Sequence, residues 1–134
     1  MPQAHKGNES QLLLKVHSRR VPFDCARTDR AFAALFGQAE SAFWLDSSRA
    51  EPGLARFSFM GAATGESGAV VTYDQRRGEV TVRERGRTQV QRETIYSYLS
   101  RELSRRRCRA DELPFDFNGG FVGYFGYELK ADEI

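Results

Sequence analysis

Histidine and cysteine are scarce in this sequence, and their scarcity limits the chemistry that the chain can carry. The 134 residues include two cysteines and two histidines. Cys25 and Cys108 form no Cys-x-x-Cys pair, and neither has a nearby histidine in a metal-ligand pattern. Protein zinc sites need such clusters, so we expect no zinc site, and reduced thiols are the simplest interpretation.

Several catalytic motifs are also missing. The chain has no Gly-x-x-x-x-Gly-Lys-Ser/Thr phosphate loop, no Gly-x-Ser-x-Gly nucleophile elbow and no His-Glu-x-x-His metal motif. Both histidines lie near the start, which leaves few ways to build a Ser/His/Asp triad. We therefore assign no catalytic residue and no metal ligand to this chain.

Long apolar runs and a strong net charge are absent too. No apolar run approaches the length of a membrane helix, and residues 1–10 lack the apolar core of a signal peptide. The 20 basic and 18 acidic residues leave a net charge of +2, too small to indicate a nucleic-acid partner. We expect neither membrane nor nucleic-acid binding, and a cytoplasmic location follows by default.

Basic residues do gather in one stretch, where two interpretations stay open. One is a solvated helix end, whose cations complement the helix dipole. The other is a binding site for a polyanion. The residues concerned are Arg101, Arg105, Arg106, Arg107 and Arg109.

The composition is that of a globular chain, and its first half predicts one helix between strands. Hydrophobic residues make up 40% and charged residues 28% of the sequence. Gln11–His17 is a short apolar run typical of a strand. Apolar residues after Thr28 recur at helical spacing until Gly37, a favoured residue at helix ends. Strands are predicted over Ser41–Asp46 and Arg56–Gly61. The apolar helix face consists of Ala31, Phe32, Leu35 and Phe36.

The second half predicts a hairpin, a helix and a final strand. The hairpin joins Ala69–Tyr73 to Glu79–Glu84, and a short strand near Val90 follows. An amphipathic helix is predicted over Thr94–Arg107 and a strand over Asn118–Leu129. This order favours an α+β fold, with a mixed, mainly antiparallel sheet and two or more helices.

The glycines of the last predicted strand do not follow the order of a nucleotide-binding loop, and aromatic residues lie between them. Glycine in a strand permits close approach of another backbone or side chain, so we expect a strand packed on both faces. Glu128 would then make a structural ion pair among aromatic rings. Gly123→Val is expected to destabilise the protein strongly.

Two stretches resemble a known family. Pro114–Asp132 (PFDFNGGFVGYFGYELKAD) is similar to the Gly-Gly-x-x-Gly-Tyr-x-x-Tyr-Glu signature of component I of chorismate-using synthases. These enzymes are anthranilate synthase and aminodeoxychorismate synthase. Ala42–Ser48 (AFWLDSS), followed by Ala55–Gly61 (ARFSFMG), resembles the family's Leu-Leu-Glu-Ser … Arg-Tyr-Ser-x-x-Gly element. Two sequences, Phe-Trp-Leu-Asp-Ser-Ser (43–48) and Gly-Tyr-Phe-Gly-Tyr-Glu-Leu-Lys (123–130), resemble those of the aminodeoxychorismate branch.

The resemblance implies a division of the chain and a larger parent enzyme. Residues 1–20 form a lead-in and first strand, and residues 21–134 form the family's N-terminal domain. This domain is part of a two-lobed α/β/β/α sandwich, so we expect the front part of a larger enzyme that is inactive alone. Alternatives are anthranilate synthase, a non-catalytic module that binds an aromatic amino acid, and an unrelated α+β scaffold.

The resemblance also implies partners and a cofactor. The family's full-length chain uses ammonia from a glutamine amidotransferase subunit or fused domain. Mg²⁺ and the acid–base groups belong to the C-terminal chorismate-binding domain, which these residues do not include. Mg²⁺ is therefore expected in that domain and no cofactor in this chain.

A small-molecule pocket is the last implication of the resemblance. In several members this region binds tryptophan, and the matching positions are Leu45, Ser47, Leu54 and Phe57. A serine hydroxyl can bond the ligand's ammonium or carboxylate, while leucine and phenylalanine cover the indole. The structural alternative is that Ser47 caps a turn and the other three are core residues.

Overall fold

The computed structural model describes residues 12–47, 57–65, 68–109, 113–115, 117 and 119–133. These residues belong to two compact units. Unit 1 combines the described residues up to Arg20 with those in the range Ile95–Phe121. Unit 2 combines the described residues of Val21–Thr94 with those from Val122 onwards. The described helices and antiparallel sheets confirm the predicted α+β class.

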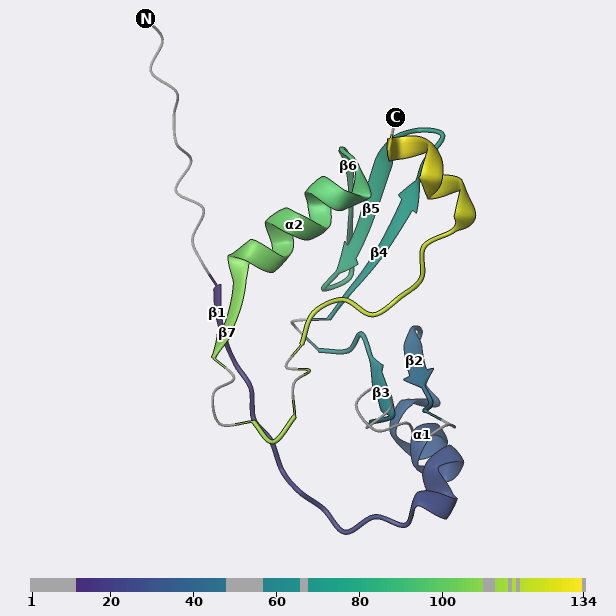
Figure 1. Ribbon diagram of the computed structural model, residues 1–134, viewed down its shortest axis with the longest axis vertical. Coiled ribbons are helices and arrows are strands. Elements are labelled where there is room, and N and C mark those ends of the chain that lie inside the picture. The colour runs from purple at the N-terminus through teal and green to yellow at the C-terminus, as the bar shows by residue number, and fades with distance from the viewer. Residues whose placement is uncertain are drawn as a thin grey trace, which may run out of the picture. The chain divides into compact units, whose positions relative to one another are not determined.

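Unit 1 contains a parallel strand pair and one helix. Strand β1 (Leu12–Lys15) pairs in parallel with β7 (Arg106–Arg109), and Leu12 lies opposite Arg106. Helix α2 (Ile95–Arg105) continues directly into β7 with no residue between them (Figure 1). A parallel pair always needs a long connection, and here much of the chain lies between the two strands in sequence.

The predicted helix over Thr94–Arg107 is confirmed, with its end two residues earlier. Ile95 and Tyr98 are buried, as their spacing predicts, and the Tyr98 ring meets Phe121 edge-on at 6.3 Å between centroids. Strand β7 was not predicted because its sequence, Arg-Arg-Cys-Arg, shows no alternation of polar and apolar residues. Its pairing with β1 depends on a segment far away in the sequence.

Unit 2 contains a three-stranded antiparallel sheet in the order β4-β5-β6 (Figure 1). Its strands are β4 (Ala69–Asp74), β5 (Glu79–Glu84) and β6 (Arg87–Arg92). Arg85 and Gly86 join β5 to β6 with φ angles of 52° and 70°. Positive φ at both central residues is the geometry of tight hairpin turns. The predicted hairpin and the strand near Val90 are thus confirmed.

The central strand β5 contributes the buried residues of this sheet. Val80 and Val82 are two residues apart, so their side chains lie on the same face, and both are buried. Glu79, Thr81 and Glu84 on this strand are only partly exposed. The β-branched valines therefore supply the apolar face of the sheet.

The rest of unit 2 is a short helical segment followed by a strand pair. The 3₁₀ turn η1 (Cys25–Arg27) leads into α1 (Thr28–Phe36), and β2 (Ala42–Leu45) pairs antiparallel with β3 (Phe59–Ala62). Phe32 stacks on Trp44 at 5.5 Å between ring centroids, which fixes the apolar face of α1 against β2. One predicted member of that face is wrong, since Leu35 is 70% exposed.

The strand predicted over Asn118–Leu129 is wrong. Residues 119–126 belong to no strand, and Tyr127–Glu133 forms the 3₁₀ helix η2; Asn118 lies outside the described residues. Alternating glycines and aromatics favour an extended chain, but a strand also needs a partner strand. Among the described strands, none pairs with this segment.

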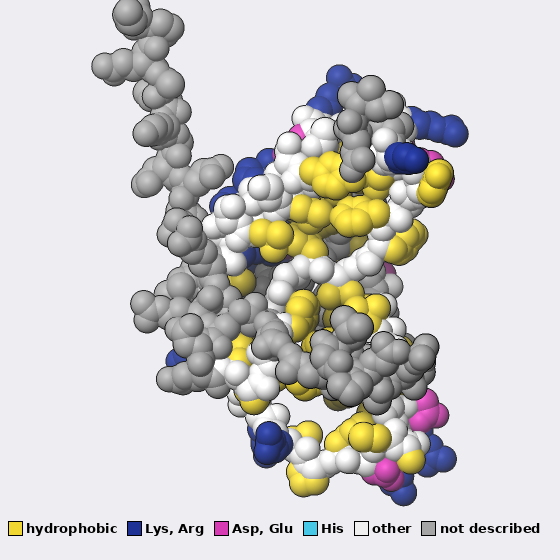
Figure 2. Space-filling model, viewed as in Figure 1, with side chains coloured by type: hydrophobic (Ala, Val, Ile, Leu, Met, Phe, Trp, Pro, Cys, Tyr) yellow, Lys and Arg dark blue, Asp and Glu magenta, His cyan; other side chains and the backbone are white. Residues whose placement is uncertain are grey.

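Side chains of this segment accordingly lie at the surface. Hydrophobic side chains reach the surface on the face drawn in Figure 2. Tyr124 is 95% exposed and Tyr127 is 85% exposed. Glu128 is exposed rather than buried among aromatic rings, so the environment predicted for its ion pair is also wrong. In the described part of the chain, no helix has the length and apolar character needed to cross a membrane.

Substitution of two glycines is expected to affect the stability of the protein differently. A Cβ atom on Gly68 would lie 2.6 Å from the Thr64 backbone nitrogen, whereas one on Gly123 would meet nothing within 4 Å. We expect Gly68→Ala to lower the free energy of unfolding by about 1–3 kcal/mol, because backbone atoms must move. Gly123→Ala should change it by less than about 0.5 kcal/mol.

Urea unfolding of the two variants measures this difference directly. The strong destabilisation expected from the sequence for Gly123→Val is wrong, since open space surrounds that position. A larger loss for Gly123→Ala than for Gly68→Ala would contradict both statements.

Candidate functional site

The residues predicted to form a ligand pocket lie where β2 and β3 end. Leu45 is the last residue of β2 and pairs with Phe59, the first residue of β3. Ser47 follows β2, and Phe57 precedes β3. The strand pairing therefore brings three predicted residues together, while Leu54 lies outside the described residues.

Side-chain hydrogen bonds extend the pairing beyond the two strands. The Ser47 hydroxyl donates to the Phe57 carbonyl oxygen at 2.8 Å, and the Ser47 backbone N–H donates to Ser58 Oγ at 3.0 Å. Ser58 Oγ in turn donates to Asp46 Oδ1 at 2.8 Å. We call Asp46, Ser47, Phe57 and Ser58 the serine clasp. These hydrogen bonds join the segment after β2 to the segment before β3, beyond the last backbone pair of the two strands.

Apolar side chains flank the serine clasp and remain accessible. Leu45 is 51% exposed and Phe57 is 41% exposed, with the Phe57 ring tilted against Phe59 at 6.0 Å between centroids. Residues of a packed core would be covered. Ser47 bonds a residue ten positions away and so does not cap a local turn as the structural alternative has it, and Leu45 and Phe57 are too exposed for core positions. Ligand binding here stays a prediction.

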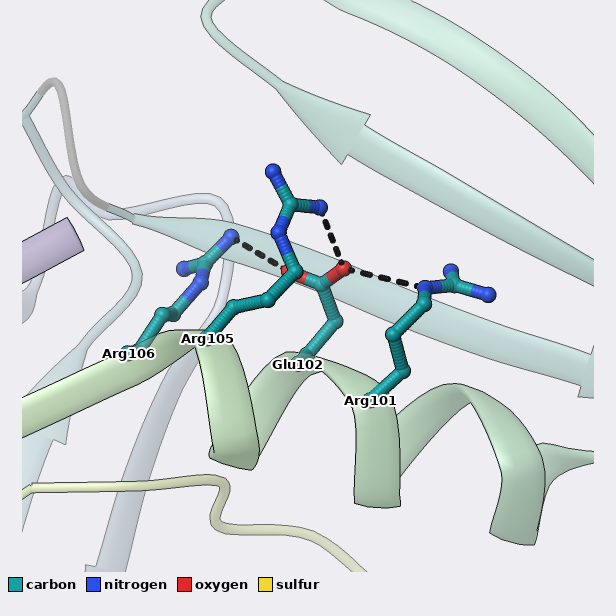
Figure 3. Close-up of polar contacts among 4 residues, drawn as sticks. All are labelled: Arg101, Glu102, Arg105 and Arg106. Atoms are coloured by element: carbon teal, nitrogen blue, oxygen red, sulfur yellow. Dashed lines mark hydrogen bonds and ion pairs between the residues drawn. The ribbon is translucent and has the colours of Figure 1, made fainter. Parts of the chain in front are cut away.

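A second polar cluster lies on α2 and its junction with β7. Glu102 is 6% exposed, and three arginines surround its carboxylate (Figure 3). Arg105 Nη1 lies 3.1 Å from Oε1, Arg101 Nε 3.5 Å from Oε1, and Arg106 Nη2 3.3 Å from Oε2. We call these four residues the Glu102 cluster.

The Glu102 cluster explains part of the basic stretch seen in the sequence. Three of the five arginines contact one carboxylate, and the Arg101 guanidinium also lies 5.3 Å from the Tyr98 ring centroid. This arrangement favours a structural role for Arg101, Arg105 and Arg106 over a solvated helix end. The side chains of Arg107 and Arg109 lie outside the described residues.

Sequence reasoning missed this cluster, although it contained a signal. Glu102 occupies a position on the apolar face of the predicted helix, in line with Ile95 and Tyr98. A carboxylate is rarely buried without cationic partners. An acidic residue on such a face, with arginines three and four positions later, therefore indicates a buried ion-pair cluster.

The described residues contain few groups that could bind a metal or undergo redox chemistry. Among the described residues, no three His, Cys, Asp or Glu side chains come together as a metal site would require. Cys25 is a free, exposed thiol. The described residues at the end of β2 and β3 thus offer hydroxyl groups and exposed apolar side chains.

Removal of the Glu102 charge should destabilise the chain. Glu102→Gln keeps the side-chain shape but leaves three guanidinium groups facing one another without their carboxylate. We expect the free energy of unfolding to fall by about 1–2 kcal/mol, less than for a fully buried pair because the arginines are partly exposed. Urea unfolding at low salt measures the loss.

A matched control separates this effect from the loss of any carboxylate. Glu79 pairs with Arg92, whose side chain is 85% exposed, at 3.4 Å. Glu79→Gln should therefore cost less than about 0.5 kcal/mol. Because salt screens repulsion among cations, added NaCl should reduce the loss in Glu102→Gln. Equal losses in the two variants would show that Glu102 has no special role.

Comparison with known proteins identifies relatives that are much longer than this chain. A Streptomyces pristinaespiralis protein named aminodeoxychorismate synthase is 50% identical over 105 residues, which are 78% of this chain and 15% of that protein. A Streptomyces griseus protein of the same name is 40% identical over 102 residues, 76% of this chain and 14% of that protein.

A plant relative agrees with the two bacterial ones. The Oryza sativa subsp. japonica protein named "Probable aminodeoxychorismate synthase, chloroplastic" is 37% identical over 119 residues, 78% of this chain and 13% of that protein. No protein-family model matches the chain. The resemblance predicted from the two motifs is confirmed, and the chain is homologous to a segment of these proteins.

Proposed function

We propose that this chain acts as part of an aminodeoxychorismate synthase. Such an enzyme converts chorismate and glutamine-derived ammonia to 4-amino-4-deoxychorismate, the precursor of p-aminobenzoate in folate biosynthesis. The observation that carries the proposal is the 50% identity, over 78% of this chain, to a protein with that name. The names of the matched relatives favour this branch over anthranilate synthase.

In this proposal the chain is a scaffold and is not catalytically competent alone. Among its described residues no three His, Cys, Asp or Glu side chains come together to hold a metal, and it corresponds to 15% of the length of its Streptomyces pristinaespiralis relative. The chorismate-binding groups and their Mg²⁺ belong to the remaining length, and this chain is the N-terminal part of the two-lobed fold. A glutamine amidotransferase subunit or domain supplies ammonia. We place the activity in the cytoplasm, whereas the rice relative is named chloroplastic.

Segment exchange tests the proposal. The matched segment of the Streptomyces pristinaespiralis relative is replaced by the corresponding residues of this chain, and the product formed from chorismate and glutamine is identified by chromatography. We expect the chimera to form 4-amino-4-deoxychorismate, because the exchanged segment would make the same contacts. The chain alone should form none.

The control is a chimera that carries the equivalent segment of an anthranilate synthase. It should lose most of the activity, because its contacts evolved with a different remainder. If this chain's chimera is folded but inactive while the anthranilate synthase chimera is active, the assignment fails.

The end of β2 and β3 supports a second proposal, a pocket for tryptophan lined by Leu45, Ser47, Leu54 and Phe57. The Ser47 hydroxyl hydrogen is directed at the Phe57 carbonyl oxygen. A hydroxyl has one hydrogen to donate but also lone pairs that accept, so Ser47 Oγ would accept from the ligand ammonium. The exposed Leu45 and Phe57 side chains would cover the indole.

Titration calorimetry with tryptophan tests this pocket. We expect binding by the wild-type chain and about a tenfold weaker affinity for Phe57→Ala, because an aromatic contact of roughly 1.4 kcal/mol is lost. Leu35→Ala serves as the control, since Leu35 is an exposed apolar residue on α1. Absence of heat at millimolar tryptophan, or equal affinities in the three proteins, would reject the pocket.

A further inference from the structure

The Glu102 cluster contains more positive than negative charge. Its one carboxylate faces the guanidinium groups of Arg101, Arg105 and Arg106, which come from α2 and the first residue of β7 (Figure 3). The C-terminal end of a helix adds only about half of a negative charge. The three positive charges of this cluster therefore exceed the negative charge that the cluster itself supplies, and an anion from solution would reduce the excess.

Arg105 also contains a hydrogen-bond donor that lacks an acceptor. Its Nη1 atom lies 3.1 Å from Glu102 Oε1, whereas its Nε atom is buried and has no hydrogen-bond partner in the described part of the chain. A buried donor without an acceptor destabilises a structure. A guanidinium binds an anion most strongly through two parallel N–H groups, so Arg105 retains an N–H group for such a contact that Glu102 does not use.

The arginines of the cluster are accessible to solvent, although the carboxylate is not. The side chains of Arg101, Arg105 and Arg106 are 33%, 36% and 25% exposed, whereas that of Glu102 is 8% exposed. An anion from solution would therefore meet the guanidinium groups before it meets the carboxylate that repels it. A small rotation of the Arg105 guanidinium would bring its Nε–H group to the anion. Salt screens partly buried charges of this kind less than exposed ones.

We propose that the Glu102 cluster is a binding site for a phosphate group. Arg105 binds the phosphate through Nε and a terminal nitrogen, because the planar guanidinium matches the spacing of two phosphate oxygens. Arg101 and Arg106, which lie on either side of Arg105 in Figure 3, add positive charge. Glu102 holds the guanidinium groups in place before binding, so less side-chain entropy is lost when the phosphate arrives. The site involves residues of unit 1 alone and does not depend on the proposed function.

Equilibrium dialysis with inorganic phosphate tests the site near neutral pH, where a phosphate group carries about 1.5 to 2 negative charges. We expect a dissociation constant in the millimolar range for the wild-type chain. The melting temperature is measured in parallel, in phosphate and in sodium chloride of equal ionic strength. At a phosphate concentration of about ten times the dissociation constant, it should be about 5 °C higher than in chloride.

Three variants distinguish the site from a general effect of phosphate. Arg105→Gln removes a positive charge and the Nε donor, so the dissociation constant should rise about tenfold or more. Arg92→Gln is the matched control, since Arg92 also pairs with a glutamate, Glu79, but lies in unit 2; its dissociation constant should equal that of the wild type. Glu102→Gln should bind phosphate about tenfold more tightly, because the repelling carboxylate is gone.

Equal dissociation constants in the wild type and Arg105→Gln would overturn the site. Phosphate also stabilises proteins in general because it is excluded from their surfaces, so an equal rise in melting temperature in all variants would overturn it too. If Arg105→Gln does not fold, Glu102→Gln decides the matter, and unchanged or weaker phosphate binding by that variant rejects the proposal.

Two further probes define the ligand. Phenyl phosphate, compared with inorganic phosphate, shows whether the site prefers a phosphate ester or the free ion; binding of either supports the site, and binding of neither rejects it. Succinate carries two carboxylates in place of a phosphate group. Succinate binding as tight as phosphate binding would overturn the assignment to phosphate.

Discussion

One buried carboxylate organises unit 1. Glu102 lies on the apolar face of α2, where a charge is tolerated only with partners, and three guanidinium groups supply them. Arg105 ends the helix and Arg106 begins β7, so the same carboxylate fixes both sides of a junction that has no loop. Arg106 also lies opposite Leu12 in the pairing of β7 with β1.

Unit 2 depends on shorter-range interactions. Tight turns connect β4, β5 and β6, so neighbouring strands find one another along the chain. The pairing of β2 with β3 spans a longer connection, and the serine clasp adds side-chain hydrogen bonds where that ladder ends. Leu45 and Phe57 flank the clasp and remain exposed.

The segment with the glycine-rich family motif and the predicted ligand pocket lie at different places in this chain. The glycine- and aromatic-rich segment resembles the synthase family, yet its residues 119–126 belong to no strand and Tyr124 and Tyr127 are exposed.

The sequence by itself determined the elements whose signals are local. Apolar spacing identified α1 and α2, and the alternation with turn residues identified β4, β5 and β6. The two motifs placed the chain among its relatives. Tertiary structure alone decided the β1–β7 pairing, the burial of Glu102 and the exposure of Leu35. It also decided that Phe121–Gly126 is no strand here, because a strand exists only where a second one pairs with it, and no local pattern contains its partner.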